Sequence, residues 1–235
     1  MLVRVAALPE LYRPEPGARP VVIDVLRFTT CVAAALQAGA EAILPCSTPE
    51  EALGGRRPGD LVAGERQSLP LPGFDLGNSP REFTPERVGG RTVRATTTNG
   101  TRALGLAGAG LCAALVNRAA VAAWLAREEG PVWLVCSGNG GAFAAEDWLA
   151  AGALVAGLRE RGVPVEADDA ARAAEAWFRA CPPGALAGVL AACDHGRSLV
   201  RKGLGDDLEV CAALDAWDVV PAFRDGEIRA LRVRA

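Results

Sequence analysis

Short apolar runs alternate with helix-like segments over the first two thirds of the chain. The runs are rich in valine, leucine, isoleucine and alanine on both faces, which is typical of strands buried in a parallel sheet. The pattern predicts an α/β protein with three layers, α/β/α, and a largely parallel or mixed sheet. The expected strands are Leu2–Leu8, which could be an edge strand, Pro20–Leu26, Glu41–Cys46, Gly59–Arg66, Arg91–Thr96, Leu111–Val116 and Pro131–Val135.

The hydrophobic pattern changes after Val163. From there the sequence offers helices and turns, and it closes with Asp225 and Gly226 between two alternating runs, which is a hairpin signal. We therefore divide the chain into an α/β core of residues 1–163, which carries the functional site, and a segment of residues 164–235. This segment is helical with a terminal β-hairpin, and it packs on the core. A hairpin at the sheet edge would allow a homodimer.

Side chains that can cap helices precede several of the expected helices. Thr48 stands before Pro49 and a helical run, and Ser79 and Asn117 stand before two others. Serine, threonine and asparagine at such positions accept hydrogen bonds from free N–H groups of the first turn. We expect all three to act as caps.

Composition excludes several classes of protein. Half of the 235 residues are hydrophobic, which suffices for a substantial core, and a net charge of -3 gives no basic excess for a nucleic-acid surface. The apolar stretches are interrupted by charged residues, so none is expected to span a membrane. Seven cysteines without a C-x-x-C pair predict reduced, buried thiols in a cytoplasmic protein.

Polar residues gather where the expected strands end. In open α/β sheets, ligands bind at the carboxyl ends of the strands, so these side chains are expected around one pocket. In chain order they are Asp24, Arg27, Glu65, Arg66, Asp75, Asn78, Ser79, Thr97, Thr98, Asn99, Gly100, Thr101, Asn117, Arg118, Ser137, Gly138, Asn139, Glu146 and Asp147.

Two of these junctions are rich in hydrogen-bond donors, "TTTNGT" at residues 96–101 and "CSGNGG" at residues 136–141. Free backbone N–H groups and the helix dipole favour an anion where a strand leads into a helix. The alternatives are a plain turn at the first and a flexible glycine loop at the second. With Arg27, Arg66 and Arg118, the two junctions would suit a ligand with several anionic groups.

Acidic residues at the same strand ends predict a divalent cation. Asp24 lies in an apolar strand, where an unpaired carboxylate is costly, and this favours a functional role. The set Asp24, Glu65, Asp75 and Asp147 could hold Mg²⁺, which takes carboxylate oxygens and bridges to phosphate. Glu65 and Arg66 could instead form a surface ion pair, and Glu146 could complement a helix dipole. The single histidine, His195, is expected to be structural.

The motifs, taken in order, resemble one known family. "VVIDVLRFTT", "GER", "GFDLGNSP", "TTTNGT", "VN" and "CSGNGG…EDWLAAG" are similar to the 2-phosphosulfolactate phosphatase family from about Val21 to Val155. A weaker likeness continues through "HGRSLVRKGLGDDLEVCA" to Pro221. The resemblance implies a three-layer α/β/α fold and a Mg²⁺-dependent phosphatase of coenzyme M biosynthesis. Such an enzyme converts 2-phosphosulfolactate to sulfolactate and phosphate.

On this basis each candidate residue receives an expected role. Catalysis is assigned to Asp24, Glu65, Arg27 and Glu146. Binding of a small anionic phosphorylated substrate is assigned to Arg66, Asn78, Ser79, Thr97, Thr98, Asn99, Gly100, Thr101, Asn117, Arg118, Ser137, Gly138 and Asn139. A phosphoryl-aspartate intermediate on Asp24 stays open. Two alternative functions also stay open: a phosphatase or lyase that acts on another small phosphorylated acid, and an anion-binding protein without catalysis.

Overall fold

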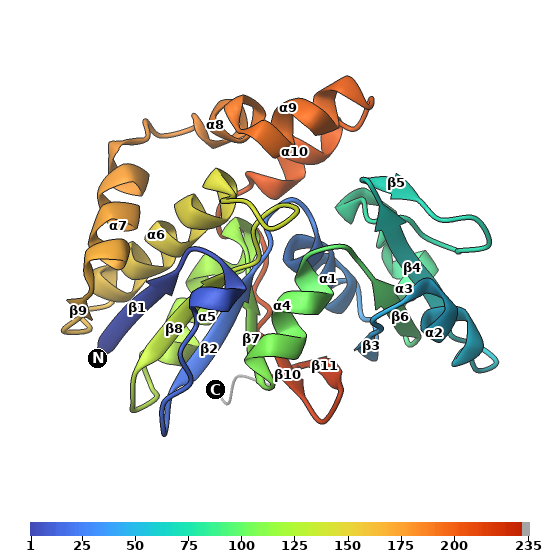
Figure 1. The fold of residues 1–235 in the computed structure, drawn as a ribbon, viewed down its shortest axis with the longest axis horizontal. Coiled ribbons are helices and arrows are strands. Elements are labelled where there is room, and N and C mark those ends of the chain that lie inside the picture. Colours follow the sequence, from blue (N-terminus) through green and yellow to red (C-terminus); the bar gives the residue numbers. More distant parts are fainter. Residues whose placement is uncertain (232–235) are drawn as a thin grey trace.

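A single sheet organises the computed structural model, which describes residues 1–231 (Figure 1). Its strand order is β5-β4-β6-β3-β11-β10-β7-β2-β8-β1-β9. The strands are β1 (Leu2–Ala6), β2 (Arg19–Ile23), β3 (Ala42–Pro45), β4 (Leu61–Arg66), β5 (Leu69–Pro70), β6 (Thr92–Thr96), β7 (Gly110–Ala113), β8 (Val132–Cys136), β9 (Glu166–Ala167), β10 (Pro221–Arg224) and β11 (Glu227–Ala230). The neighbours within β4-β6-β3 and within β7-β2-β8-β1-β9 run parallel, so the sheet is largely parallel, as predicted.

Helices follow most of the parallel strands, because parallel neighbours need a crossover connection, which is usually a helix. They are α1 (Phe28–Gln37), α2 (Pro49–Gly54), α3 (Pro85–Val88), α4 (Gly100–Ala107), α5 (Arg118–Leu125), α6 (Ala145–Glu160), α7 (Asp169–Ala180), α8 (Leu186–Ala192), α9 (Asp194–Arg201) and α10 (Asp206–Cys211), with short 3-10 turns at Pro9–Leu11, Pro80–Glu82 and Leu115–Asn117. None of the helices among residues 1–231 has the length and hydropathy needed to cross a bilayer.

Side chains alternate between the two faces of the sheet and so build two apolar layers. In β2, Val21 and Ile23 belong to a cluster that includes Leu149 and Leu154 of α6. Val22, between them, belongs to a second cluster that includes Phe28 of α1. Because both faces are covered by helices, the predicted three-layer α/β/α fold is confirmed.

The C-terminal hairpin lies inside the sheet, which corrects the expectation that it forms an edge. β10 pairs with β7 through Phe223 and Gly110, and β11 pairs with β3 through Ile228 and Ile43. The hairpin therefore joins the two parallel halves of the sheet and offers no free edge to a second copy. The sheet ends instead at β5 and β9, which have two residues each, and β1 lies inside it between β8 and β9.

Only one of the three expected caps forms. The Thr48 side chain accepts the Glu51 N–H, as predicted. The Asn117 side chain instead accepts the Ala114 N–H at 2.8 Å and donates to the Val219 carbonyl at 3.2 Å, so it ties β7 to the chain before β10. Ser79 caps no helix, because its hydroxyl donates to Asp207.

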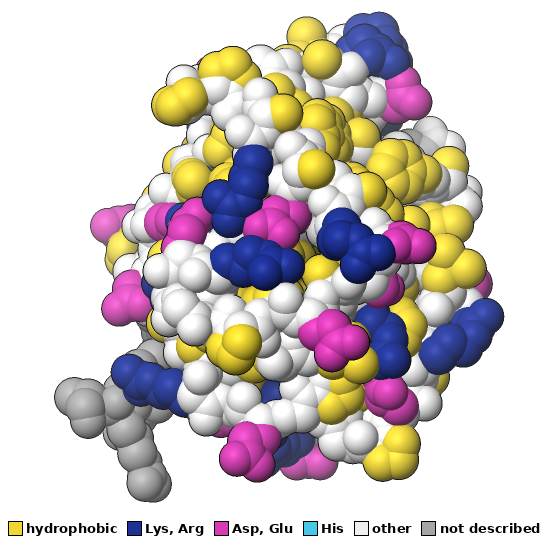
Figure 2. All heavy atoms as spheres, turned by 90° about the vertical axis from the view of Figure 1, so that its left-hand side faces the viewer, with side chains coloured by type: hydrophobic (Ala, Val, Ile, Leu, Met, Phe, Trp, Pro, Cys, Tyr) yellow, Lys and Arg dark blue, Asp and Glu magenta, His cyan; other side chains and the backbone are white. Residues whose placement is uncertain are grey.

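Two further expectations concern cysteines and surface charge. All seven cysteines are free thiols, and only Cys181 is not buried. Figure 2 shows acidic and basic side chains interspersed over the face at the left of Figure 1. On α7, the largely buried Glu175 pairs with Arg159 at 3.0 Å and with Arg179 at 2.8 Å.

Close packing of α6 on α7 gives a test of the fold. A Cβ atom at Gly152 of α6 would overlap the Ala174 carbonyl oxygen of α7, so Gly152→Ala must push the helices apart. We expect a loss of about 1–3 kcal/mol in the free energy of unfolding, measured by urea denaturation. Gly105→Ala in α4 is the matched control, since its Cβ meets nothing within 4 Å and should stabilise by about 0.5–1 kcal/mol. Equal effects of the two substitutions would contradict this packing.

Candidate active site

A cavity of about 360 Å³ lies where β2, β4, β6 and β8 end. The expectation that several strand ends meet at one pocket is confirmed for these four strands. The C-terminal helices also reach the cavity, through α9. Its lining residues are Asp24, Leu26, Arg27, Glu65, Arg66, Gln67, Ser68, Asn78, Thr97, Thr98, Asn99, Asn139, Gly140 and His195.

Asp24 follows β2 and stands at the start of α1. Its Oδ1 accepts the Phe28 N–H at 3.1 Å, which is a free donor of the first helical turn. Burial raises the pKa of Asp24 to about 6, while the Phe28 N–H and His195 lower it and the carboxylates of Glu65 and Glu146 raise it. This pKa lies nearer to neutral pH than the ordinary value of 3.8, as is typical of a side chain that exchanges protons in a site.

The "TTTNGT" junction donates hydrogen bonds to a carboxylate of the protein itself, that of Glu65. Oε1 of Glu65 accepts the Thr98 N–H at 2.9 Å and the Thr98 hydroxyl at 3.0 Å, and its Oε2 accepts the Ser68 N–H at 2.7 Å. Glu65 thus occupies donors that we expected to face the substrate. Thr97 and Asn99 line the cavity beside it.

Neighbouring residues of this junction fix its shape. The Asn99 side chain accepts the Gly140 N–H at 3.0 Å and so links the two donor-rich junctions. The Thr101 hydroxyl donates to the Thr97 carbonyl at 2.9 Å and does not line the cavity. Position 100 requires glycine, because a Cβ there would lie 2.7 Å from Oδ2 of Asp24.

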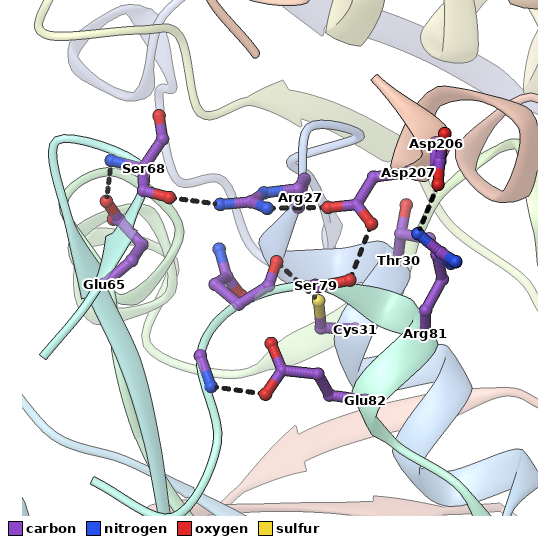
Figure 3. Close-up of polar contacts among 12 residues, drawn as sticks. Arg27, Thr30, Cys31, Glu65, Ser68, Ser79, Arg81, Glu82, Asp206 and Asp207 are labelled. Atoms are coloured by element: carbon purple, nitrogen blue, oxygen red, sulfur yellow. Dashed lines mark hydrogen bonds and ion pairs between the residues drawn. The ribbon is translucent and has the colours of Figure 1, made fainter. Parts of the chain in front are cut away.

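Arg27 and Arg66 bring positive charge to the cavity. Arg27 is buried and donates to Oδ2 of Asp207 at 2.6 Å and to the Ser68 carbonyl at 2.8 Å (Figure 3). Arg66 donates to the Glu65 carbonyl at 2.7 Å and to the Thr96 hydroxyl at 3.1 Å. Each guanidinium has five N–H donors, and these bonds use only some of them. The bonds also fix the orientation of each guanidinium beside the cavity.

The loop after β8 and the start of α6 form a layer next to the lining residues. Asp147 accepts the Val25 N–H at 2.8 Å and the Gly138 N–H at 3.1 Å. Burial raises the pKa of Asp147 well above its usual range, and the nearby Asp24 carboxylate adds to this. Ser137 is also buried, and its hydroxyl has no partner among residues 1–231.

Three further candidates do not line the cavity and have structural contacts. Asp75 accepts the Val62 N–H at 2.8 Å and pairs with Arg56 at 3.0 Å. Arg118 pairs with Asp215 at 2.6 Å and with Glu160 at 3.0 Å. Asn117 makes the strand-joining bonds described above. Of the candidates, the structure brings to the cavity Asp24, Arg27, Glu65, Arg66, Asn78, Thr97, Thr98, Asn99 and Asn139, whose roles in binding and catalysis stay predictions.

Sequence reasoning missed His195 and Asp207. His195 lines the cavity, with Nδ1 3.4 Å from Oε1 of Glu146 and Nε2 3.5 Å from the Ser68 hydroxyl. Asp207 holds Arg27 and accepts the Ser79 hydroxyl at 2.6 Å. Both residues lie in the stretch "HGRSLVRKGLGDDLEVCA", so its likeness to the family was a usable signal.

The carboxylates at the cavity fit Mg²⁺ only in the binding mode that uses few protein ligands, with water and substrate phosphate as the others. Within residues 1–231, no three His, Cys, Asp or Glu side chains form a group that could hold a metal ion. Both oxygens of Glu65 and both of Asp147 accept N–H groups, whereas Asp24 lines the cavity and accepts one such bond, at Oδ1. Mg²⁺ commonly binds through one or two carboxylates with water and substrate phosphate. The residues therefore fit an ion held by Asp24 and a phosphate.

Comparisons with known proteins show the family of the chain. A family model described as 2-phosphosulpholactate phosphatase matches residues 8–226. A protein of Symbiobacterium thermophilum named "Probable 2-phosphosulfolactate phosphatase" is 41% identical over 219 residues, which cover 90% of this chain and 94% of that protein. A protein of the same name from Synechococcus sp. (strain RCC307) is 45% identical over 217 residues, with 86% and 87% covered. The chain belongs to the 2-phosphosulpholactate phosphatase family, as its motifs predicted.

Proposed function

We propose that this protein is a Mg²⁺-dependent phosphatase. It hydrolyses the phosphomonoester of 2-phosphosulfolactate, or of a closely related phosphorylated hydroxy acid, and releases the hydroxy acid and phosphate. A role in coenzyme M biosynthesis stays a prediction from the resemblance. The observation that carries the proposal is the cavity around Asp24, lined by two arginines and by hydroxyl and amide donors, in a chain that matches the family over residues 8–226.

The chemistry of the cavity suits this substrate. 2-Phosphosulfolactate carries phosphate, sulfonate and carboxylate groups, and a cavity of about 360 Å³ is large enough for such a small molecule. Arg27 and Arg66 can each bind an anionic group through N–H bonds left free by their protein partners. Thr97, Asn99 and Asn139 add uncharged polar groups. These contacts would orient the phosphorus atom toward Asp24.

Asp24 is the group best placed for the chemical step. It lines the cavity, and in its ionised form it can accept a proton from the attacking water or attack phosphorus itself. Mg²⁺ bound at Asp24 would neutralise charge on the phosphate and lower the pKa of a bound water. Glu65 holds the Thr98 and Ser68 N–H groups, and thereby shapes the cavity wall.

Phosphate release is the direct test of this function. We expect wild type to release phosphate from racemic 2-phosphosulfolactate with Mg²⁺ and to lose that activity in EDTA. Asp24→Asn keeps the shape of the side chain but removes its charge, and should lower kcat by at least about 10²-fold. No release by folded, metal-loaded wild type would refute the substrate. Wild-type rates in the variant would refute the role of Asp24.

Arg66 and Arg118 form a matched pair for testing the substrate-binding arginines. Arg66→Gln removes a cation from the cavity, so KM should rise about tenfold or more, which corresponds to roughly 1.4 kcal/mol of binding energy. Arg118→Gln should leave KM unchanged and lower the melting temperature, because Arg118 pairs with Asp215 and Glu160. Steady-state kinetics and thermal unfolding measure both effects. A larger KM effect at position 118 would contradict the assignment.

The raised pKa of Asp24 makes stability depend on pH. Its folded pKa of about 6 exceeds the ordinary value of 3.8, so ionised Asp24 destabilises the fold as pH rises from 4 to 7. Asp24→Asn should therefore have a higher free energy of unfolding than wild type at pH 8, by on the order of 2–3 kcal/mol at most. The two proteins should unfold alike near pH 4. Calorimetry in EDTA measures this, and a constant difference across pH would exclude the effect.

A further inference from the structure

We propose that His195 is the general acid of the reaction and that Glu146 is its positioning residue. In this role Nε2 of His195 gives a proton to the oxygen that leaves phosphorus. The proposal rests on the phosphatase function proposed above and assigns a further residue to that site. Sequence reasoning had left His195 a structural role, so the assignment depends on the contacts of its ring.

The two ring nitrogens of His195 have different surroundings. Nδ1 lies 3.4 Å from Oε1 of Glu146, whose side chain is 3% exposed. Nε2 lies 3.5 Å from the Ser68 hydroxyl, and both His195 and Ser68 line the cavity, whereas Glu146 does not. A carboxylate at one ring nitrogen fixes the orientation of the ring and leaves the other nitrogen for proton transfer. The geometry therefore directs Nε2 toward the cavity.

Burial of Glu146 supports this pairing. A buried carboxylate is costly unless a positive group or hydrogen bonds compensate it. Among the residues that the structure describes, His195 is the ion-pair partner of Glu146. When the ring of His195 carries a second proton, it neutralises that charge and holds the proton that the leaving group needs. The pair thus joins α9, from the C-terminal segment, to α6 of the core.

The leaving group explains why such a donor is needed. Hydrolysis of a phosphorylated hydroxy acid expels a secondary alkoxide, which is a strong base and a poor leaving group without protonation. As water oxygen bonds to phosphorus, the ester P–O bond breaks and its electron pair stays on the ester oxygen. That oxygen takes the proton from Nε2 and becomes the hydroxyl of the product. Neutral imidazole then regains a proton from the attacking water or from solvent.

The other charged groups around the cavity are less suited to this step. Arg27 and Arg66 hold their protons too tightly to serve as acids. Both oxygens of Glu65 accept N–H groups. Asp24 is assigned to the attacking side, where it accepts a proton or bonds to phosphorus. His195 is therefore the proton donor of the described cavity lining, and histidine is the side chain most often used for this purpose.

The experiment compares two leaving groups in His195→Gln. With 2-phosphosulfolactate, kcat should fall by about 10²–10⁴-fold. With 4-nitrophenyl phosphate, whose leaving group is far more acidic and needs little protonation, the loss should be less than about tenfold. Retained turnover of the aryl ester also shows that the variant is folded. An equal loss on both esters, or no loss on either, would overturn the proposal.

A second measurement uses 2-phosphosulfolactate alone and so does not depend on the aryl ester. His195→Ala leaves space for a free imidazole, and added imidazole should raise its kcat at least about tenfold in a saturable way. Absence of rescue in a folded His195→Ala variant would overturn the proton-donor role. If wild type turned over no phosphate ester, the proposed function and this inference would both fail. If wild type is active and the His195 variants lack the expected effects, the inference alone fails.

Glu146 and a control on the same helix complete the test. Glu146→Gln should lower kcat for 2-phosphosulfolactate about tenfold with little change in KM, and should spare 4-nitrophenyl phosphate. A merely structural role would affect both esters equally. Arg197→Gln, on the exposed side of α9, should leave kcat and KM at wild-type values. If it reproduced the loss of His195→Gln, the effect would belong to the helix and the proposal would fail.

Discussion

The buried ion pair between Arg27 and Asp207 is the constraint on which the site depends. It joins residues that lie 180 positions apart, and both side chains are almost fully buried. Charges withdrawn from water need close pairing and further hydrogen bonds, which the Ser68 carbonyl and the Ser79 hydroxyl supply (Figure 3). As a result, the start of α1, the loop after β4 and helix α10 keep fixed positions around the cavity.

Charge balance in the cavity links the proposed metal to the proposed acid. Arg27 and Arg66 face a lining that also contains the carboxylates of Asp24 and Glu65, so the protein brings little net positive charge. A substrate with phosphate, sulfonate and carboxylate groups needs further cations when it leaves water. Mg²⁺ held by Asp24 and a protonated ring at His195 would supply this charge.

The local pattern of the sequence predicted the layers, the parallel strands and nine of the lining residues, because strand ends carry their chemistry in a few adjacent positions. It could not predict partners that tertiary packing selects. The donors of "TTTNGT" were expected to face the substrate, but Glu65 accepts hydrogen bonds from two of them. Arg118 and Asp75 follow the same local rule, yet they pair with Asp215 and Arg56. His195 reaches the cavity only because α9 packs there.

The position of the C-terminal hairpin has a consequence for biosynthesis. β10 and β11 are the last strands of the described chain, yet they fill the middle of the sheet between β7 and β3. While the ribosome is still making residues 221–230, the two parallel halves have no strands to join them and expose unpaired backbone. Assembly of the central sheet must therefore follow translation of the hairpin, and until then β3 and β7 each have an unpaired edge of the kind that favours aggregation.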